Sequence, residues 1–551
     1  MPASGSTARS SDSIKRLTLV ACILGSGIAL LDGTIVNVAL PTIQDDLGGG
    51  LAAQQWVVNA YLLTLGSLIL IGGSLGDLFG ERRIFALGVG GFGVASLLCA
   101  LAPSIEALIA ARALQGVASA LLTPSALAVI VATFPESERG PAIGSWTAWG
   151  GIAAVLGPLA GGELLAIGSW RWIFLVNLPF VALCLGLILL VIPRAQTRPR
   201  DTSRPRRIDV GGALLCALGL GGPVFALIEQ PRLGWSSPAV SIPLIAGGAL
   251  LVCFVLYESR TRDPMLPLGL FRRRNFSAGN VETFSMYAGL AILFFFLVLF
   301  LQQIAGYTPL QSGLATLPTT VVMFTLSRRF GALADRHGPR LFMGAGPLLA
   351  ACGLLLFQRV GVHVNYLTDV LPGLLVFSVG LSMTVAPLTA AVLAGVETEQ
   401  AGIASAVNNA VARVAGLMGT AAVGAAIAAS FVAHLDSNLE GRPLGPRAQV
   451  TVSEAKKLPL GLPDTAGLPP RQARAVTAAA ENASLESFHL GMGIAALLVA
   501  AGGVVGAVGV RNPRRVVLAE ECEGGALVGA SLDAAGCHEA AEGEPALATP
   551  A

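Results

Sequence analysis

The chain of 551 residues is 54% hydrophobic and only 12% charged, with a formal net charge of +2 and a mean hydropathy of +0.72. Soluble globular proteins carry about 25% charged residues, so this composition excludes a soluble protein and indicates one that lies in a membrane. Basic residues scattered over loops, cysteines without a C-x-x-C pair and histidines without ligand spacing predict no nucleic-acid partner, no metal and no cofactor.

Fourteen apolar segments are long enough to cross a bilayer, for which a helix needs about 20 residues. The expected spans are 17–40, 54–73, 84–102, 105–133, 142–167, 172–192, 209–229, 239–257, 276–301, 311–330, 341–358, 370–395, 402–432 and 487–510. The predicted fold is therefore all-α, with both ends of the chain on one side of the membrane. Residues 1–14 and 511–551 are expected to be disordered tails, because their polar composition offers little to bury.

The distribution of positive charge predicts the orientation. With a cytoplasmic amino terminus, 24 of the 35 arginines and lysines lie in inner segments and 9 in outer ones, and Arg112 and Arg413 fall within spans. Six of the outer nine belong to one long loop near 434–486. Because positive residues gather on the cytoplasmic side, we predict that both termini lie inside the cell, on the inner face of the cytoplasmic membrane.

A charged loop repeats half a chain apart. The segment GSLGDLFGERR begins at Gly73, GALADRHGPR begins at Gly331, and both read G-x-x-x-D-x-x-G. The matching and flanking positions are Gly73, Asp77, Gly80, Arg82 and Arg83 in the first copy, and Gly331, Asp335, Arg336, Gly338 and Arg340 in the second. Such internal repeats are common in secondary transporters. We therefore expect related halves at 15–192 and 276–510, with two inserted spans in a linker at 193–275.

Two charges lie deep in spans of the first half. Asp32 stands about 24 Å along its helix from Arg16, and Arg112 about 12 Å below the outer surface, so the two could meet. A carboxylate at that depth costs several kcal/mol unless it is paired, hydrated or protonated, which suits a proton carrier. The alternatives are a structural hydrogen bond for Asp32 and a permanent ion pair for Arg112.

The fifth span combines glycines with a proline. Gly157 and Gly161 are four residues apart on one face, where another backbone can approach closely, and Pro158 bends the helix. Glu163 lies toward the outer end of the same span, where it either acts in transport or simply reaches water.

Two further charges lie within spans of the second half. Glu282 is about 12 Å past Arg274 along its helix. It could bind a cationic substrate, bind protons, or pair with an arginine on the inner side. Arg413 is either a structural partner or a site residue.

Together these motifs resemble the major facilitator superfamily. The first loop, the fourth-span motif at Arg112, Gln115 and Gly116, and the Gly157–Gly161 motif match the family's signatures in order. The segments LDGTIVNVALP from Leu31 and WRWIFLVNLP from Trp170 are similar to those of the fourteen-span drug:proton antiporters. The first loop departs from the family at Leu78, where an arginine is usual. The resemblance covers about residues 15–510.

The resemblance implies two pseudo-symmetric six-helix halves plus two inserted helices. It implies proton-coupled efflux of small amphipathic organic molecules, drugs or antibiotics, by alternating access, performed by a monomer in the lipid bilayer. Asp32 and Arg112 would couple protons, Glu282 would lie on a helix that faces the cavity, and the two loops would latch the inner ends of the halves together. The alternative is an uptake carrier or uniporter for a small metabolite. An enzyme is not expected, because the spans contain no cluster of catalytic residue types.

Overall fold

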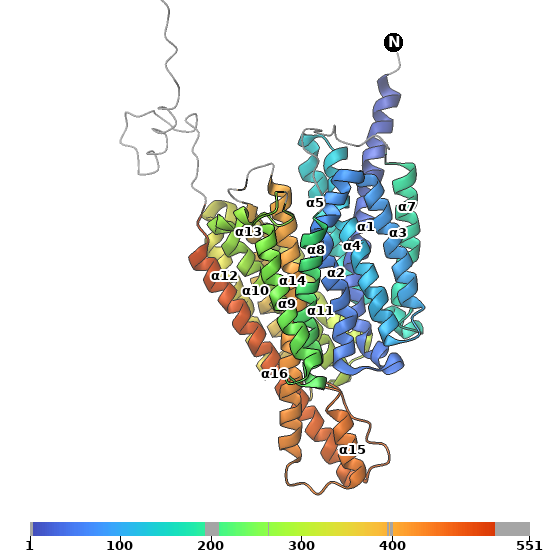
Figure 1. The fold of residues 1–551 in the computed structure, drawn as a ribbon, viewed down its shortest axis with the longest axis vertical. Helices are drawn as coiled ribbons and strands as arrows, with labels where there is room; N and C mark the ends of the chain where they lie inside the picture. The colour runs from blue at the N-terminus through green and yellow to red at the C-terminus, as the bar shows by residue number, and fades with distance from the viewer. Residues whose placement is uncertain (1–3, 193–208, 263, 394–395, 397–399, 513–551) are drawn as a thin grey trace, which may run out of the picture. The chain divides into compact units, whose positions relative to one another are not determined.

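The computed structural model describes residues 4–192, 209–262, 264–393, 396 and 400–512 (Figure 1). Within these ranges every regular element is helical, and twelve helices are long and apolar enough to cross a membrane. The expected spans at 142–167 and 311–330 form helices that are not among those twelve. The basic stretch 193–208 and residues 513–551 of the expected tail lie outside the described residues.

The first half of the bundle runs to residue 190. Its helices are α1 (Ser4–Leu47), α2 (Gly50–Phe79), α3 (Glu81–Ala100), α4 (Ile105–Thr133), α5 (Glu136–Ile167), α6 (Trp172–Leu175) and α7 (Asn177–Leu190). α1 begins at Ser4, so residues 4–14, expected as a disordered tail, continue the first span as helix. Extending an existing helix is far easier than nucleating a new one. Buried apolar side chains, including Phe85 and Phe92 of α3 and Cys184 of α7, form the core of this half.

The inserted pair consists of α8 (Val210–Leu233) and α9 (Pro238–Glu258). α8 packs on both halves of the bundle, because its buried Val224 and Ile228 share an apolar cluster with Leu417 and Ala421 of the second half and with side chains of α2. At one end of α8, Nε1 of Trp56 in α2 donates a hydrogen bond of 3.1 Å to Glu229. The inserted pair therefore covers the line along which the halves meet.

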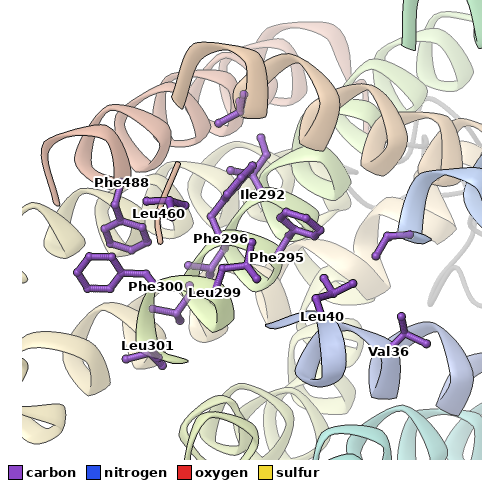
Figure 2. Packing of buried hydrophobic residues seen from close by; sticks show 14 of the residues in the cluster. Val36, Leu40, Ile292, Phe295, Phe296, Leu299, Phe300, Leu301, Leu460 and Phe488 are labelled. Carbon is purple, nitrogen blue, oxygen red and sulfur yellow. The ribbon is translucent and has the colours of Figure 1, made fainter. Parts of the chain in front are cut away.

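The second half repeats the pattern of the first. Its helices are α10 (Arg274–Gln303), α11 (Pro309–His337), α12 (Pro339–Leu356), α13 (Leu371–Leu393), α14 (Ala401–Leu439), α15 (Pro446–Ala455) and α16 (Pro470–Gly509). Short helical turns at Leu268–Arg272, Phe357–Arg359 and Tyr366–Val370 connect them. The core is rich in phenylalanine, and the rings of Phe300 and Phe488 stack with centroids 4.5 Å apart (Figure 2).

Each copy of the repeated loop forms the same break between two helices. Gly80 separates α2 from α3 with a φ of 95°, and Gly338 separates α11 from α12 with a φ of 82°. These values lie in the left-handed region, which glycine adopts without steric cost. The repeat seen in the sequence is therefore a repeat of backbone conformation.

The arginine after each break binds within its own half. Arg82 donates hydrogen bonds to the carbonyls of Ile188 and Leu189, at 3.0 and 2.8 Å, where α7 ends. Arg340 donates one of 2.6 Å to the carbonyl of Ala507, where α16 ends. Both arginines thus satisfy carbonyls that a helix end leaves without an intrahelical partner. The expected latch between the halves stays a prediction.

The halves meet through polar contacts near one end of the bundle. Gln302, near the end of α10, donates a hydrogen bond of 3.0 Å to the carbonyl of Val38, near the end of α1. Gln55, near the start of α2, donates one of 2.6 Å to the carbonyl of Thr420 in α14. These contacts lie at the end where α1 finishes, opposite to the end where the chain begins (Figure 1).

The expected loop at 434–486 is mostly helical. α14 continues to Leu439, α15 follows, and α16 already begins at Pro470. Residues 431–486 therefore form a compact projection, called the cap below (Figure 1). Its own apolar cluster includes Phe431, Leu435 and Ala480, all fully buried. An ion pair of 2.6 Å joins Lys456 to Asp436, and Nε2 of His434 lies 2.7 Å from a carboxyl oxygen of Glu486.

One turn of the cap contacts both halves. Leu460 is fully buried against the core and lies beside Phe488 (Figure 2). It is the one described non-glycine residue with a positive φ, 61°. The carbonyl oxygen of Lys457 lies against Gly50 at the start of α2, and Gly461 lies near Gln303 at the end of α10. The turn therefore bridges the first half and the second.

Candidate functional site

Asp32 of α1 and Arg112 of α4 form an ion pair sealed from solvent. Nη1 of Arg112 lies 2.5 Å from Oδ2 of Asp32, and the two side chains are 1% and 0% exposed. The structure thus brings together the two charges that their depths in the sequence allowed to meet. Such a buried pair is favourable only when further hydrogen bonds satisfy the remaining donors and acceptors.

Polar groups from three further positions in the first half complete the pair. Gln115 and Asn177 donate hydrogen bonds of 3.0 and 3.2 Å to Oδ1 of Asp32. Nε of Arg112 donates one of 3.0 Å to the carbonyl of Val57. The network therefore connects α1, α2, α4 and α7, and both carboxyl oxygens of Asp32 accept hydrogen bonds.

Sequence reasoning missed part of this network. The sequence pattern predicts neither Asn177, which lies in the segment WRWIFLVNLP, as a partner of Asp32, nor Ser96, which accepts a hydrogen bond of 3.0 Å from Asn177. Both are fully buried. Both could be predicted as members of a polar network because each is a lone polar residue inside an apolar span, and such a residue needs a hydrogen-bond partner in a membrane.

Glu282 lies inside the second half rather than between the halves. Its side chain is fully buried and has no hydrogen-bond partner among the described residues. It points toward α16 and α12, because a Cβ at Gly506 would contact both its carboxyl group and the carbonyl of Met343. The sequence placed Glu282 on a helix expected to face the cavity, and the structure places it on another face of that helix.

Arg413 lies where α14 meets the first half. Its Cβ would be 3.3 Å from a Cβ at Gly66 of α2, and its guanidinium is within electrostatic reach of the phenols of Tyr61 and Tyr287. The side chain is half-buried and has no hydrogen bond or ion pair to any described residue. Tyr61 also lies under Arg112, whose guanidinium carbon is 4.5 Å from the ring centroid. Tyr61 is therefore influenced by the charges of both Arg112 and Arg413.

The glycine-proline motif of α5 sits between α1 and α11. A Cβ at Gly157 would overlap the hydroxyl of Thr34, and one at Gly161 would press on Ile35, so both glycines permit close approach of α1. The carbonyl of Pro158 lies against Gly313 of α11 in the second half. The motif is thus a contact between the halves as well as within the first.

The other residues predicted from the sequence lie on the surface or outside the described part of the structure. Glu163 is exposed near the end of α5, and Arg83 and Arg336 are exposed beside their loops. The side chains of Asp77 and Asp335 lie outside the part that the structure describes. Within that part, no group of three or more metal-ligating side chains occurs.

A helical bundle of two repeated halves, with charges buried in its spans, is the architecture of a membrane transporter. The chain belongs to the major facilitator superfamily, because the model described as Major Facilitator Superfamily matches residues 22–420. It is therefore a multi-pass membrane transporter of small molecules rather than an enzyme.

Relatives and solved structures agree with this assignment. The puromycin resistance protein pur8 of Streptomyces alboniger is 39% identical over 421 residues, which cover 76% of this chain and 82% of the relative. The tetracenomycin C resistance and export protein of Streptomyces glaucescens is 33% identical over 506 residues, covering 89% and 90%. A bacterial homolog to the human lysosomal transporter Spinster, in an inward-facing and unoccupied conformation, has a TM-score of 0.58 at 16% identity and covers 91% of this chain and 99% of its own. That last likeness shows the fold alone.

Proposed function

We propose that this protein exports small amphipathic organic molecules, drugs or antibiotics, in exchange for protons. Two relatives at 39% and 33% identity are named for puromycin resistance and for tetracenomycin C resistance and export. Within this chain, the observation that carries the proposal is the sealed Asp32–Arg112 pair. A carboxylate buried in a span is costly to keep there, and such groups commonly serve as proton relays.

Protonation of Asp32 is the proposed coupling step. Neutral Asp32 leaves the Arg112 guanidinium buried without a counter-charge, which costs several kcal/mol. The network must then rearrange, and with it the packing of α1, α2, α4 and α7, which the network connects. Proton and substrate can then alter each other's affinity through one shared change of conformation, as exchange requires.

We propose that α5 and α11 also cross the membrane, which gives fourteen spans and both termini in the cytoplasm. Their 32 and 29 residues extend about 48 and 44 Å, longer than a hydrocarbon core of about 30 Å. The two helices pack on each other at Pro158 and Gly313. A helix shielded by protein on one face can carry more polar residues than one surrounded by lipid. The charge distribution supports the orientation in the cytoplasmic membrane.

In that orientation the polar contacts between the halves lie on the outer side. We infer that the structure represents the state in which the inner ends of the halves are apart. The two Gly/Asp loops lie at those inner ends and are proposed to latch the halves when the transporter opens outward. Arg82 and Arg340, which bind within their own halves, would keep each loop in place for that contact.

Transport in vesicles tests the proposal. The purified protein, reconstituted with an imposed pH gradient, should accumulate compounds from a panel of cationic, neutral and anionic molecules against their gradients. Asp32→Asn, compared at equal amounts of folded protein in the vesicles, should abolish accumulation, because the amide cannot carry a proton. Undiminished accumulation by Asp32→Asn would remove Asp32 from the mechanism, and transport indifferent to the pH gradient would favour a uniporter.

A further inference from the structure

Arg413 carries a positive charge that the described structure leaves uncompensated. It lies 12 residues past the start of α14, about 18 Å along the helix, well inside a span. It makes no hydrogen bond or ion pair with a described residue. A charged side chain inside a span is costly unless it faces water or a partner. Arginine also stays protonated, so it cannot avoid that cost by releasing its proton.

The surroundings of Arg413 come from both halves. Tyr61 belongs to α2 and Tyr287 to α10, and both phenols are within electrostatic reach of the guanidinium. On α14 itself, Asn409 precedes Arg413 by one turn and is exposed on the same face. Gly66 of α2, which has no side chain, leaves room beside the arginine. The Arg413 guanidinium therefore lies where α14 meets α2, in a region that holds one tyrosine from each half.

No described acid balances this charge. Asp32 is already neutralised by Arg112 at 2.5 Å. Glu282 points into the second half, toward Gly506, and Glu163 is exposed near the end of α5. Among the described residues, the Arg413 guanidinium thus gives a net positive charge to the region where α14 meets α2. A positive charge favours anions and disfavours cations.

We propose that Arg413 binds an acidic group, such as a carboxylate or phenolate, of an aromatic substrate, and that Tyr287, which is partly exposed, contacts the adjoining ring. The proposal rests on the efflux function above and specifies its substrate class. A guanidinium matches the geometry of a carboxylate through two parallel hydrogen bonds. Tyrosine rings offer flat apolar contact next to it.

Three dansyl probes that share one ring system and differ in charge test this inference. Dansylglycine is anionic, dansylamide is neutral and dansylcadaverine is cationic. Binding to the purified protein in detergent, without any gradient, is measured by fluorescence, and pH-driven transport is measured in vesicles. The wild type should bind dansylglycine about tenfold or more tightly than dansylcadaverine, the scale of one hydrogen-bonded charge.

The variants separate charge from geometry. Arg413→Gln should weaken dansylglycine binding about tenfold or more and change dansylamide binding less than about twofold. Arg413→Lys should retain part of the preference, because it keeps the charge but loses the fork. Arg442→Gln, which removes an exposed arginine of the cap, should change nothing. Each variant is compared only if it elutes from size-exclusion chromatography in detergent as a single folded species.

The possible failures are distinguishable. A wild type that prefers dansylcadaverine would overturn the inference without any variant and would leave the efflux function standing. Equal binding of dansylglycine by wild type and Arg413→Gln, or equal loss of all three probes, would also overturn it. Absence of pH-driven transport of every probe by the folded wild type would contradict the efflux function and this inference together.

Discussion

At the scale of the residue, two buried acids have opposite surroundings: Asp32 is paired with Arg112, whereas the carboxyl group of Glu282 has no hydrogen-bond partner among the described residues. Counting the helical rise placed Asp32 and Arg112 at compatible depths, and the structure joins them. The same counting placed Glu282 inside its span, yet its carboxyl group turns toward α16. Depth follows from 1.5 Å per residue, whereas the face of a helix depends on neighbours that come from distant parts of the chain. Glu282 could not be oriented without them.

The Asp32–Arg112 pair gives a prediction about stability. Arg112→Gln should lower the free energy of unfolding by about 3–5 kcal/mol, because it leaves a buried carboxylate without its counter-charge. Adding Asp32→Asn should restore much of that loss, since two neutral amides can hydrogen-bond to each other. Thermal unfolding of the three variants and the wild type in detergent measures the effect. A double variant that is less stable than Arg112→Gln alone would contradict this account.

At the scale of the element, the cap is helical where its polar sequence predicted a loop. Its charges and prolines predicted a loop at 434–486, but α14 and α16 continue into it and bury Leu435, Ala480 and Ala483. The apolar residues of the cap recur at helical spacing among charged ones, which is the pattern of a helix in water rather than in lipid. A search for long apolar runs does not detect such a helix.

The turn of the cap contacts both halves, so we expect that fixing it covalently to the first half blocks transport. Cysteines at Ala52 and Lys457, both at least partly exposed, should be close enough for a bifunctional thiol reagent to link them in a cysteine-free background, because the carbonyl oxygen of Lys457 lies against Gly50. The link should stop transport, because Ala52 belongs to the first half and the cap is continuous with the second. Uptake into vesicles before and after linking gives the measurement.

A matched link lies wholly within the cap. Cysteines at Asp436 and Lys456, whose side chains are paired at 2.6 Å, should be linked equally well and leave transport intact. Full transport with Ala52 and Lys457 linked would mean that the outer ends of the halves do not separate there.

At the scale of the whole molecule, motif order predicted the family before any packing was known. The repeated loop also predicted the two halves, because the repeated break at Gly80 and Gly338 needs a residue that accepts a positive φ. The number of spans was harder to predict. α11 carries enough polar residues to fall outside the twelve clearly apolar helices, since one of its faces lies against protein.

Thiol labelling tests fourteen spans and the orientation together. Single cysteines at Glu138 and His337, at the proposed inner ends of α5 and α11, should be shielded from an impermeant reagent in intact cells. Cysteines at Ile167 and Gln311, exposed at the opposite ends, should react. Thr202 should be shielded and Ser453 of the cap should react, the latter being exposed. Equal labelling at both ends of α5 or α11 would mean that this helix does not cross the membrane. A reversed pattern would mean that both termini lie outside the cell.

The arginines that close α7 and α16 have a consequence for how the chain assembles. Because Arg82 and Arg340 each complete a helix end within their own half, neither half depends on the other for these contacts. A gene divided at codon 200 should therefore yield two polypeptides that insert separately and then associate. The hydrogen bonds from Gln302 and Gln55, together with the packing of α8 on α2, remain available to join them. Co-purification of the second polypeptide with a tagged first, and export by the pair, would show that the covalent link between the halves is dispensable.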